Sequence, residues 1–225
     1  MSRFQPTHME ILPPAQRLVW PDLADAHRLG FVLYGGTAIA LRLGHRSSVD
    51  FDFFGADPLH KNLLQEAFPF LSTATAIQDE PNAYTVLVSC DLPDPRHVKV
   101  SFFGGIRFGR VGEPSWTEDG VLQVASLEDL MATKLKVLLQ RIEAKDYLDI
   151  AAMLNAGTSL ENGLASAKRL YGNTFQPSES LKALVYFEGG DLESLDWETR
   201  KRLIEAARKV RRLPPVDLLS ARLTL

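Results

Sequence analysis

The stretch FVLYGGTAIALRLGHRSSVDFDFF, residues 31–54, decides the fold. It begins with four apolar residues, Phe31 to Tyr34, and a short continuous apolar run is typical of a buried strand. Gly35-Gly36 ends this run, and the next residues, Thr37 to about Leu43, are rich in Ala, Ile and Leu, which favours a helix. A strand, a Gly-Gly turn and a helix in this order bring backbone N–H groups and the positive end of the helix to one turn, which is an arrangement that binds phosphate.

The end of the same stretch predicts a second strand. From Val49 to Phe54, apolar residues alternate with Asp50 and Asp52, so the two carboxylates lie on one face, about 6.8 Å apart along the strand. Taken alone, the pair also fits two solubilising charges at a sheet edge, and Gly-Gly alone fits a tight turn. Together they predict two ligands for a hard cation beside a phosphate cradle, which are the two halves of a nucleotidyl-transfer site.

Outward from this stretch, the first half of the chain mixes helices and strands. Apolar periodicity predicts two further helices, one before the stretch with an awkward Pro21 and one after it, at residues 14–29 and 60–68. Turn residues, including Pro93-Asp94-Pro95, separate three further strands. A loop-rich segment and a last short strand follow. The three strands are expected at residues 73–78, 84–91 and 97–103. The loop is expected at residues 104–120 and the last strand at residues 121–124.

From Ser126 onward the pattern is helical to about Leu213. Ser126, with Asp129 three residues on, is a helix-capping signal, and Asp196 is a second candidate cap before the last helix. The fold class is therefore α/β (α+β), with a small mixed sheet and flanking helices followed by a helical lobe. We expect an α/β core over residues 1–125 and a helical lobe over residues 126–225 that completes the active-site crevice.

Composition excludes several classes of protein. The chain has 225 residues, 45% of them hydrophobic, and a formal charge of −3, which suits a folded core and argues against disorder. Cys90 is the single cysteine, and neither CxxC nor HExxH occurs, so a disulfide framework or a zinc protease has no support. No secretory signal and no apolar run near the ~20 residues of a membrane span is present, so we expect a soluble, cytoplasmic protein that does not contact membranes.

The residues YGGTA, 34–38, and GHRSSVDFDFF, 44–54, resemble the nucleotidyltransferase superfamily that includes DNA polymerase beta. Thirteen residues, 37–49, separate Gly-Gly from the Asp-Phe-Asp motif, at the long end for that superfamily. The longer motif, GGTA (residues 35–38) with HRSSVDFDFF (residues 45–54), resembles more specifically the AbiEii toxin family of abortive-infection and toxin–antitoxin systems. A second block, Lys134-Leu135-Lys136 with Arg141 and then KDYLD, residues 145–149, is similar to the helical motifs of that family.

The resemblance implies an enzyme that moves a nucleoside monophosphate from an NTP to the hydroxyl of an RNA, for instance a tRNA end, or of a protein. Asp50 and Asp52 would hold Mg²⁺ or Mn²⁺, and Lys134 would stabilise the developing charge. A cognate antitoxin would be a partner. The expected phosphate-binding residues are Gly35, Gly36, Thr37, Ser48, Lys134 and Arg141, and the expected catalytic residues are Asp50, Asp52, Lys134 and Asp146.

The periodicity of residues 127–142 independently predicts an amphipathic helix. Seven apolar residues fill one continuous arc of a predicted helix, with Lys134 and Arg141 inside the arc and Lys136 on the opposite side. Two cations on a core-facing stripe either reach past their neighbours into solvent or lie beside phosphates. The seven residues are Leu127, Leu130, Met131, Leu135, Leu138, Leu139 and Ile142.

One departure from the superfamily keeps other functions open. Many members carry a third carboxylate on a later strand, whereas the equivalent face here presents Lys99, Ser101 and Phe103. Asp146 is then the candidate to activate the nucleophile. The alternatives are a catalytically silent relative that binds a nucleotide or a partner protein and regulates, and a phosphatase-like, metal-dependent hydrolase.

The last predicted helix is strongly basic. Between Arg200 and Arg212 there are seven basic residues and one acidic residue, Glu205. Such a run is either an electrostatic footprint for RNA or a solvated helix face whose last cations complement the helix dipole.

Overall fold

The computed structural model describes residues 4–91 and 96–225. The turn predicted at Pro93-Asp94-Pro95 lies outside the described residues. The chain forms two compact units, which we call the α/β unit and the helical unit. The α/β unit consists of Met1–Gly109, Glu113–Ala125 and Ser220–Leu225, and the helical unit of Arg110–Gly112 and Ser126–Leu219. The two functional domains expected over residues 1–125 and 126–225 stay a prediction.

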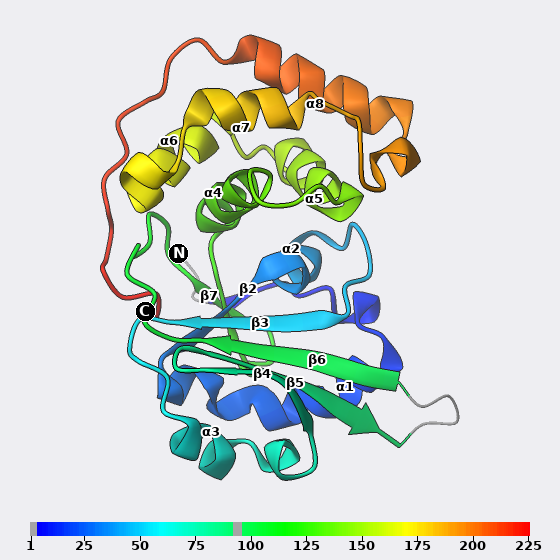
Figure 1. Cartoon of the computed structure of the whole chain (residues 1–225), viewed down its shortest axis with the longest axis vertical. Helices are drawn as coiled ribbons and strands as arrows, with labels where there is room; N and C mark the ends of the chain where they lie inside the picture. Colours follow the sequence, from blue (N-terminus) through cyan, green and yellow to red (C-terminus); the bar gives the residue numbers. More distant parts are fainter. Residues whose placement is uncertain (1–3, 92–95) are drawn as a thin grey trace. The chain divides into compact units, whose positions relative to one another are not determined.

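A mixed sheet forms the centre of the α/β unit (Figure 1). Its order is β1-β7-β8-β2-β3-β6-β5-β4, and β3 pairs parallel with β6 and antiparallel with β2. The strands expected from apolar runs and alternation are confirmed, but β1 and β7 were missed. The strands are β1 (Phe4–Gln5), β2 (Phe31–Tyr34), β3 (Asp50–Gly55), β4 (Thr75–Glu80), β5 (Ala83–Cys90), β6 (Arg96–Phe103), β7 (Ser115–Thr117) and β8 (Gln123–Val124).

Alternation along β3 divides the sheet into two faces. Phe51 and Phe53 are buried on one face, where Phe53 stacks on Phe102 and Trp20 packs 6.0 Å from Phe51 between ring centroids. Figure 1 shows α1 and α3 on one side of the sheet and α2 on the other. These elements are η1 (Met9–Ile11), α1 (Pro14–Val19), η2 (Trp20–Leu29), α2 (Gly35–Leu43), α3 (Lys61–Ala67) and η3 (Pro69–Ser72), where η denotes a 3₁₀ helix.

The helix expected over residues 14–29 is not one α-helix. Its α-helical part ends at Val19, and a 3₁₀ helix runs from Trp20 to Leu29. Pro21 has no N–H and cannot donate to the carbonyl four residues earlier, so the backbone tightens at this point. The awkward proline of the sequence is therefore the point at which one helix type gives way to the other.

The helical unit contains five α-helices within the described residues, and three of them begin at a side-chain cap. Ser126 accepts a hydrogen bond from the Asp129 N–H and Asp196 accepts one from the Thr199 N–H, so both predicted caps are confirmed; Ser159 caps in the same way. The helices are α4 (Leu127–Val137), α5 (Ala144–Asn155), α6 (Leu160–Tyr171), η4 (Gly172–Thr174), α7 (Pro177–Leu184), η5 (Leu192–Ser194) and α8 (Trp197–Lys209).

Two predicted helix ends are corrected by the structure. The apolar arc was expected to continue to Ile142, but α4 ends at Val137, and Leu139 and Ile142 are exposed. The basic helix was expected to reach Leu213, but α8 ends at Lys209. Arg141 therefore lies in the loop between α4 and α5, and Arg211 and Arg212 lie beyond the end of their helix.

Candidate functional site

The Gly35-Gly36 turn joins β2 directly to α2. Gly35 has a φ of +75°, in the left-handed region, and is the first residue of α2. Tyr34, the N-cap, makes no side-chain hydrogen bond to the helix, and the first turn carries no acidic side chain. The backbone N–H groups at a helix start need acceptors. A helix start of this kind suits an anion.

Both glycines are pressed against polar side chains. A Cβ atom on Gly35 would lie 2.4 Å from Oδ2 of Asp52. A Cβ atom on Gly36 would lie 2.4 Å from Nη2 of Arg46 and 3.2 Å from Oγ of Ser48. Any larger residue would displace these groups. The Gly-Gly pair thus allows a carboxylate, a guanidinium and a hydroxyl to approach the same turn.

β3 presents Asp50 and Asp52 together, as the alternation predicted. Both are half-buried on one face, and Phe51 and Phe53 between and after them are buried on the other. In the parallel register with β6, Asp50 lies opposite Lys99 and Asp52 opposite Ser101. Lys99 forms an ion pair with Asp50, with 3.0 Å between Nζ and Oδ2.

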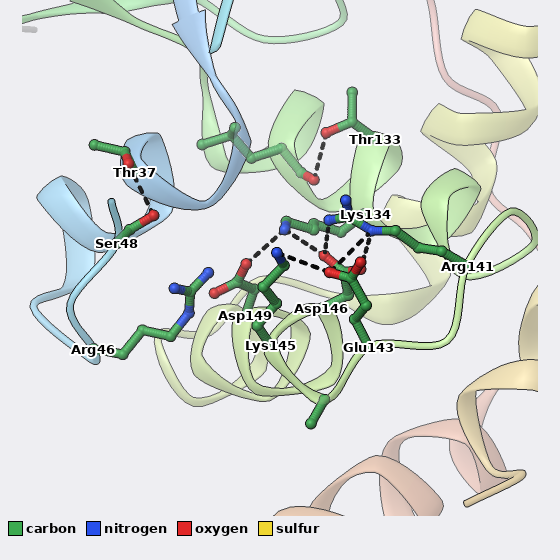
Figure 2. A network of polar contacts seen from close by, with 12 residues as sticks. Thr37, Arg46, Ser48, Thr133, Lys134, Arg141, Glu143, Lys145, Asp146 and Asp149 are labelled. Carbon is green, nitrogen blue, oxygen red and sulfur yellow. Dashed lines mark hydrogen bonds and ion pairs between the residues drawn. The ribbon is translucent and has the colours of Figure 1, made fainter. Parts of the chain in front are cut away.

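Thr37 and Ser48 connect α2 to the segment that precedes β3. Both side chains are buried, and their hydroxyl oxygens are 2.9 Å apart (Figure 2). The Thr37 hydroxyl also donates a hydrogen bond to the carbonyl of Asp50. This contact fixes the backbone of Asp50 relative to the helix that begins at the Gly35-Gly36 turn. Direct phosphate binding by Thr37 and Ser48 stays a prediction.

A second cluster of charges lies within the helical unit. Lys134 of α4 is buried, and its ammonium lies 2.6 Å from Oδ1 of Asp146 and 2.7 Å from Oδ2 of Asp149, both on α5 (Figure 2). Arg141 donates two hydrogen bonds to the Asp146 carboxylate, at 2.8 and 3.0 Å. We call Lys134, Arg141, Asp146 and Asp149 the helical charge cluster. It contains two cations and two carboxylates, so its formal charge is balanced.

Opposing effects act on the Asp146 carboxyl. Burial raises its pKa, but the hydrogen bond from Arg141 and the charge of Lys134 outweigh burial, so the pKa lies below its ordinary value. Asp146 is therefore an anion held by two cations. Lys136, on the same helix, is instead directed to the Thr174 carbonyl and the Tyr171 ring.

The basic segment of residues 200–212 is only partly available to a ligand. Arg200 donates to the Leu192 carbonyl, at 2.9 Å, and Arg202 to the Leu154 carbonyl, at 2.6 Å. The exposed basic residues are Lys201, Arg208, Lys209, Arg211 and Arg212.

The residues present fit a divalent cation that arrives with a nucleotide. Across the described parts of the chain, no group of three or more His, Cys, Asp or Glu side chains is placed to hold a metal ion. Mg²⁺ does not need such a cage, because it is commonly bound by one or two carboxylates together with substrate phosphates. Asp50 and Asp52, beside a turn that suits an anion, supply a donor set of that kind.

Sequence reasoning missed three residues that the structure brings to these clusters. Asp149 follows Asp146 by three residues, and i,i+3 spacing on a helix was the available signal. Arg46 stands in the motif preceding β3, but its approach to Gly36 has no periodic signal. Lys99 was noted only as one of three residues on a strand face without a carboxylate, whereas its ion pair with Asp50 depends on a strand order that the sequence does not contain.

On this fold, a Gly-Gly turn pressed against a strand with two aspartates defines a nucleotidyltransferase. The family model described as "Nucleotidyl transferase AbiEii toxin, Type IV TA system" matches residues 21–216, and the chain belongs to this family. The resemblance found in the sequence is thereby confirmed.

The chain is also similar to a further relative and to solved structures, and the structure from H. pylori supports the assignment of the fold. An uncharacterized protein of Aquifex aeolicus (strain VF5) is 29% identical over 161 residues, covering 70% of this chain and 74% of that protein. A crystal structure from H. pylori, described as that of a candidate nucleotidyltransferase, has a TM-score of 0.56 at 20% identity and covers 86% of this chain and 90% of its own. MenT4, a nucleotidyltransferase toxin of Mycobacterium tuberculosis, has a TM-score of 0.48 at 14% identity, covering 84% and 87%.

Among the residues that the structure describes, no helix is both long enough and apolar enough to cross a membrane.

Proposed function

We propose that the protein transfers a nucleoside monophosphate from an NTP to a hydroxyl of RNA, with a tRNA end as the preferred class of acceptor. The observation that carries this proposal is the close approach of the Asp52 carboxylate to Gly35, where a Cβ atom would lie 2.4 Å from Oδ2. It brings a turn that suits an anion next to a strand with two candidate cation ligands. In the reaction, the acceptor oxygen forms a bond to the α-phosphorus of the NTP. The bond to the bridging oxygen breaks, pyrophosphate leaves with that electron pair, and the hydroxyl proton is released to water.

The chain's own residues would bind and orient the substrate. The backbone N–H groups at Gly35 and Gly36 would bind phosphate oxygens, with Ser48 and Thr37 beside them. Asp50 and Asp52 would hold Mg²⁺ or Mn²⁺, which when bound neutralises and orients the triphosphate. Catalysis of this kind depends on positioning and electrostatic stabilisation.

The helical charge cluster has a less direct part in the proposal. Lys134 and Arg141 would act on the phosphates as cations. Asp146 would orient the side chains of Lys134 and Arg141. Asp146 was the candidate to activate the nucleophile, but a carboxylate with a lowered pKa and two cationic partners is a weak base. Orientation of Lys134 and Arg141 is the role that its contacts support.

Family membership supports one further partner. The family is described as a toxin of a type IV toxin–antitoxin system, so we propose that a cognate antitoxin belongs to the same system as this chain. The cytoplasm is the compartment in which NTPs, RNA and such an antitoxin would meet the enzyme.

The test is transfer of label from the NTP. The purified protein is incubated with Mg²⁺, total RNA and each NTP in turn, labelled at the α-phosphate. Label in RNA supports the proposal, and label in the protein itself would redirect it to a protein acceptor. Release of phosphate without transfer would indicate the hydrolase, and nucleotide binding alone the regulatory relative. Asp52→Asn serves as the inactive control, because the carboxylate is lost with little change in volume.

A further inference from the structure

The sheet face around the aspartate pair contains a fixed cation. Asp50 and Asp52 lie opposite Lys99 and Ser101 of β6, and the next strand, β5, places Leu87 and Thr85 opposite the same two β6 residues. On the other side of β3, Asp52 is opposite Tyr34. In the described parts of these strands, this face therefore holds two carboxylates and one ammonium, and no third carboxylate.

The ammonium of Lys99 is directed to the Asp50 carboxylate. Its Nζ atom lies 3.0 Å from Oδ2 of Asp50, and the side chains of Lys99 and Asp50 are 37% and 28% exposed. Lys99 is thus a half-buried side chain rather than one extended into water. Ser101 is buried at 2% exposure, and its hydroxyl is a neutral ligand at most.

Charge decides how many cations such a face holds. In a two-metal site, two divalent ions clamp the attacking and leaving oxygens, and carboxylates shared between the ions offset their charge. Two carboxylates with the Lys99 ammonium carry a formal charge of −1, and the Arg46 guanidinium that approaches the same turn adds a further positive charge. A second divalent ion beside Lys99 would meet a like charge with no further carboxylate to offset it.

We propose that the Lys99 ammonium takes the position of a second divalent cation, so that the site works with a single Mg²⁺. The inference rests on the proposed nucleotidyl transfer. Lys99 stabilises the negative charge that develops as the acceptor oxygen bonds to the α-phosphorus and pyrophosphate departs with the electron pair of the broken bond. The hydroxyl proton leaves to water, as above.

The experiment counts bound metal. Mn²⁺ is titrated into the protein saturated with an NTP analogue whose α–β bridge cannot be cleaved, and free Mn²⁺ is measured by electron paramagnetic resonance. We expect one Mn²⁺ per chain for the wild type, for Lys99→Arg and for Lys99→Met. The double variant Lys99→Met with Ser101→Asp restores a carboxylate beside Asp52, and we expect it to bind two.

Turnover gives a second readout. Lys99→Met should lower kcat by about 100-fold or more, as expected for removal of one group that stabilises transition-state charge. Lys99→Arg should keep more activity than Lys99→Met, because the charge remains. Lys61→Met is the matched control, since Lys61 also pairs with an aspartate of the sheet, Asp79 on β4, away from the aspartate pair. It should change neither the metal count nor kcat.

Two outcomes would overturn the inference: two Mn²⁺ ions on the wild type, or full turnover in a folded Lys99→Met variant. Folding is checked by thermal unfolding of each variant. Failure of the proposed function is distinguishable, because a wild-type protein that transfers no label fails the first experiment whatever its metal count. A wild type that transfers label with two bound Mn²⁺ ions refutes the role of Lys99 alone.

Discussion

Gly35 is under two constraints that can be separated by mutation. Its φ of +75° disfavours a residue with a side chain, and a Cβ atom would lie 2.4 Å from the Asp52 carboxylate. Gly157 has a comparable φ of +93°, but a Cβ atom there would meet nothing within 4 Å. Replacing each by alanine therefore compares backbone strain with and without displacement of a neighbouring group.

We expect Gly35→Ala and Gly157→Ala each to lower the free energy of unfolding by about 1–2 kcal/mol from left-handed backbone strain. Only Gly35→Ala should lose nucleotidyl transfer, by about 100-fold, because a misplacement of about 1 Å at a positioned group has that effect. Thermal unfolding and α-phosphate label transfer measure the two quantities. Equal activity of the two variants would show that Asp52 need not touch the turn.

Much of the α/β site was predictable residue by residue, because its signals are local. The alternation over Val49 to Phe54 placed Asp50 and Asp52 on one face, and the apolar run ending at Gly35 placed the turn. The Lys99–Asp50 ion pair was not predictable. It depends on parallel pairing between β3 and β6, and no local pattern states which strands are neighbours.

At the scale of elements, the loop between α4 and α5 is explained by the helical charge cluster. Arg141 binds Asp146, five residues later, and residues at that spacing do not meet on one continuous helix. This contact therefore requires a break between α4 and α5, and α4 ends at Val137 although the apolar pattern continues. β1 and β7 were missed for a different reason, since strands of two and three residues are too short to show alternation.

Removal of Lys134 should destabilise the helical unit. Lys134→Met leaves Asp146 and Asp149 with Arg141 as the remaining cation of the cluster, so one buried carboxylate loses its compensation. We expect the free energy of unfolding to fall by about 3–5 kcal/mol, as when one partner of a buried ion pair is removed. Lys136→Met, which loses an exposed contact to the Thr174 carbonyl, should cost about 1 kcal/mol or less.

Chemical denaturation measures both variants, and label transfer is then compared at a temperature where both are folded. If Lys134 acts on phosphate as well, the folded Lys134→Met protein should lose turnover while Lys136→Met keeps it. Equal stability of the two variants would contradict the buried pairing, and equal turnover would limit Lys134 to a structural role.

The lowered pKa of Asp146 predicts the sign of an acid effect. A carboxyl with a lower pKa in the folded chain than in the unfolded chain stabilises the fold above the unfolded-state pKa, and this contribution is lost as the pH falls through the folded-state pKa. We expect the free energy of unfolding to decrease below about pH 4. Urea unfolding between about pH 7 and about pH 3 should show a shallower decrease in Asp146→Asn, and an unchanged slope would remove Asp146 as the cause.

At the scale of the whole chain, charge is distributed unevenly. The formal charge is −3, yet residues 200–212 contain seven basic residues and one acidic residue. An acidic protein is repelled from RNA on average, so an RNA acceptor would have to be attracted by a local basic segment. Arg211 and Arg212 are exposed and follow the C-cap residue Val210, so changing them leaves every residue of α8 in place.

We therefore expect Arg211→Glu with Arg212→Glu to weaken RNA binding and to flatten its dependence on salt. For a single-stranded acceptor, loss of two phosphate contacts lowers the slope of log K against log salt by about 1.4. Arg28→Glu with Lys182→Glu is the matched control, because it makes the same change in net charge at exposed positions elsewhere. Filter binding of labelled tRNA over a salt series measures both variants, and NTP binding should be the same in each.

If the two variants weaken RNA binding equally, net charge alone is responsible and the 200–212 segment is an ordinary solvated surface. An effect confined to the Arg211 and Arg212 variant would instead identify the segment as the electrostatic contact for the acceptor.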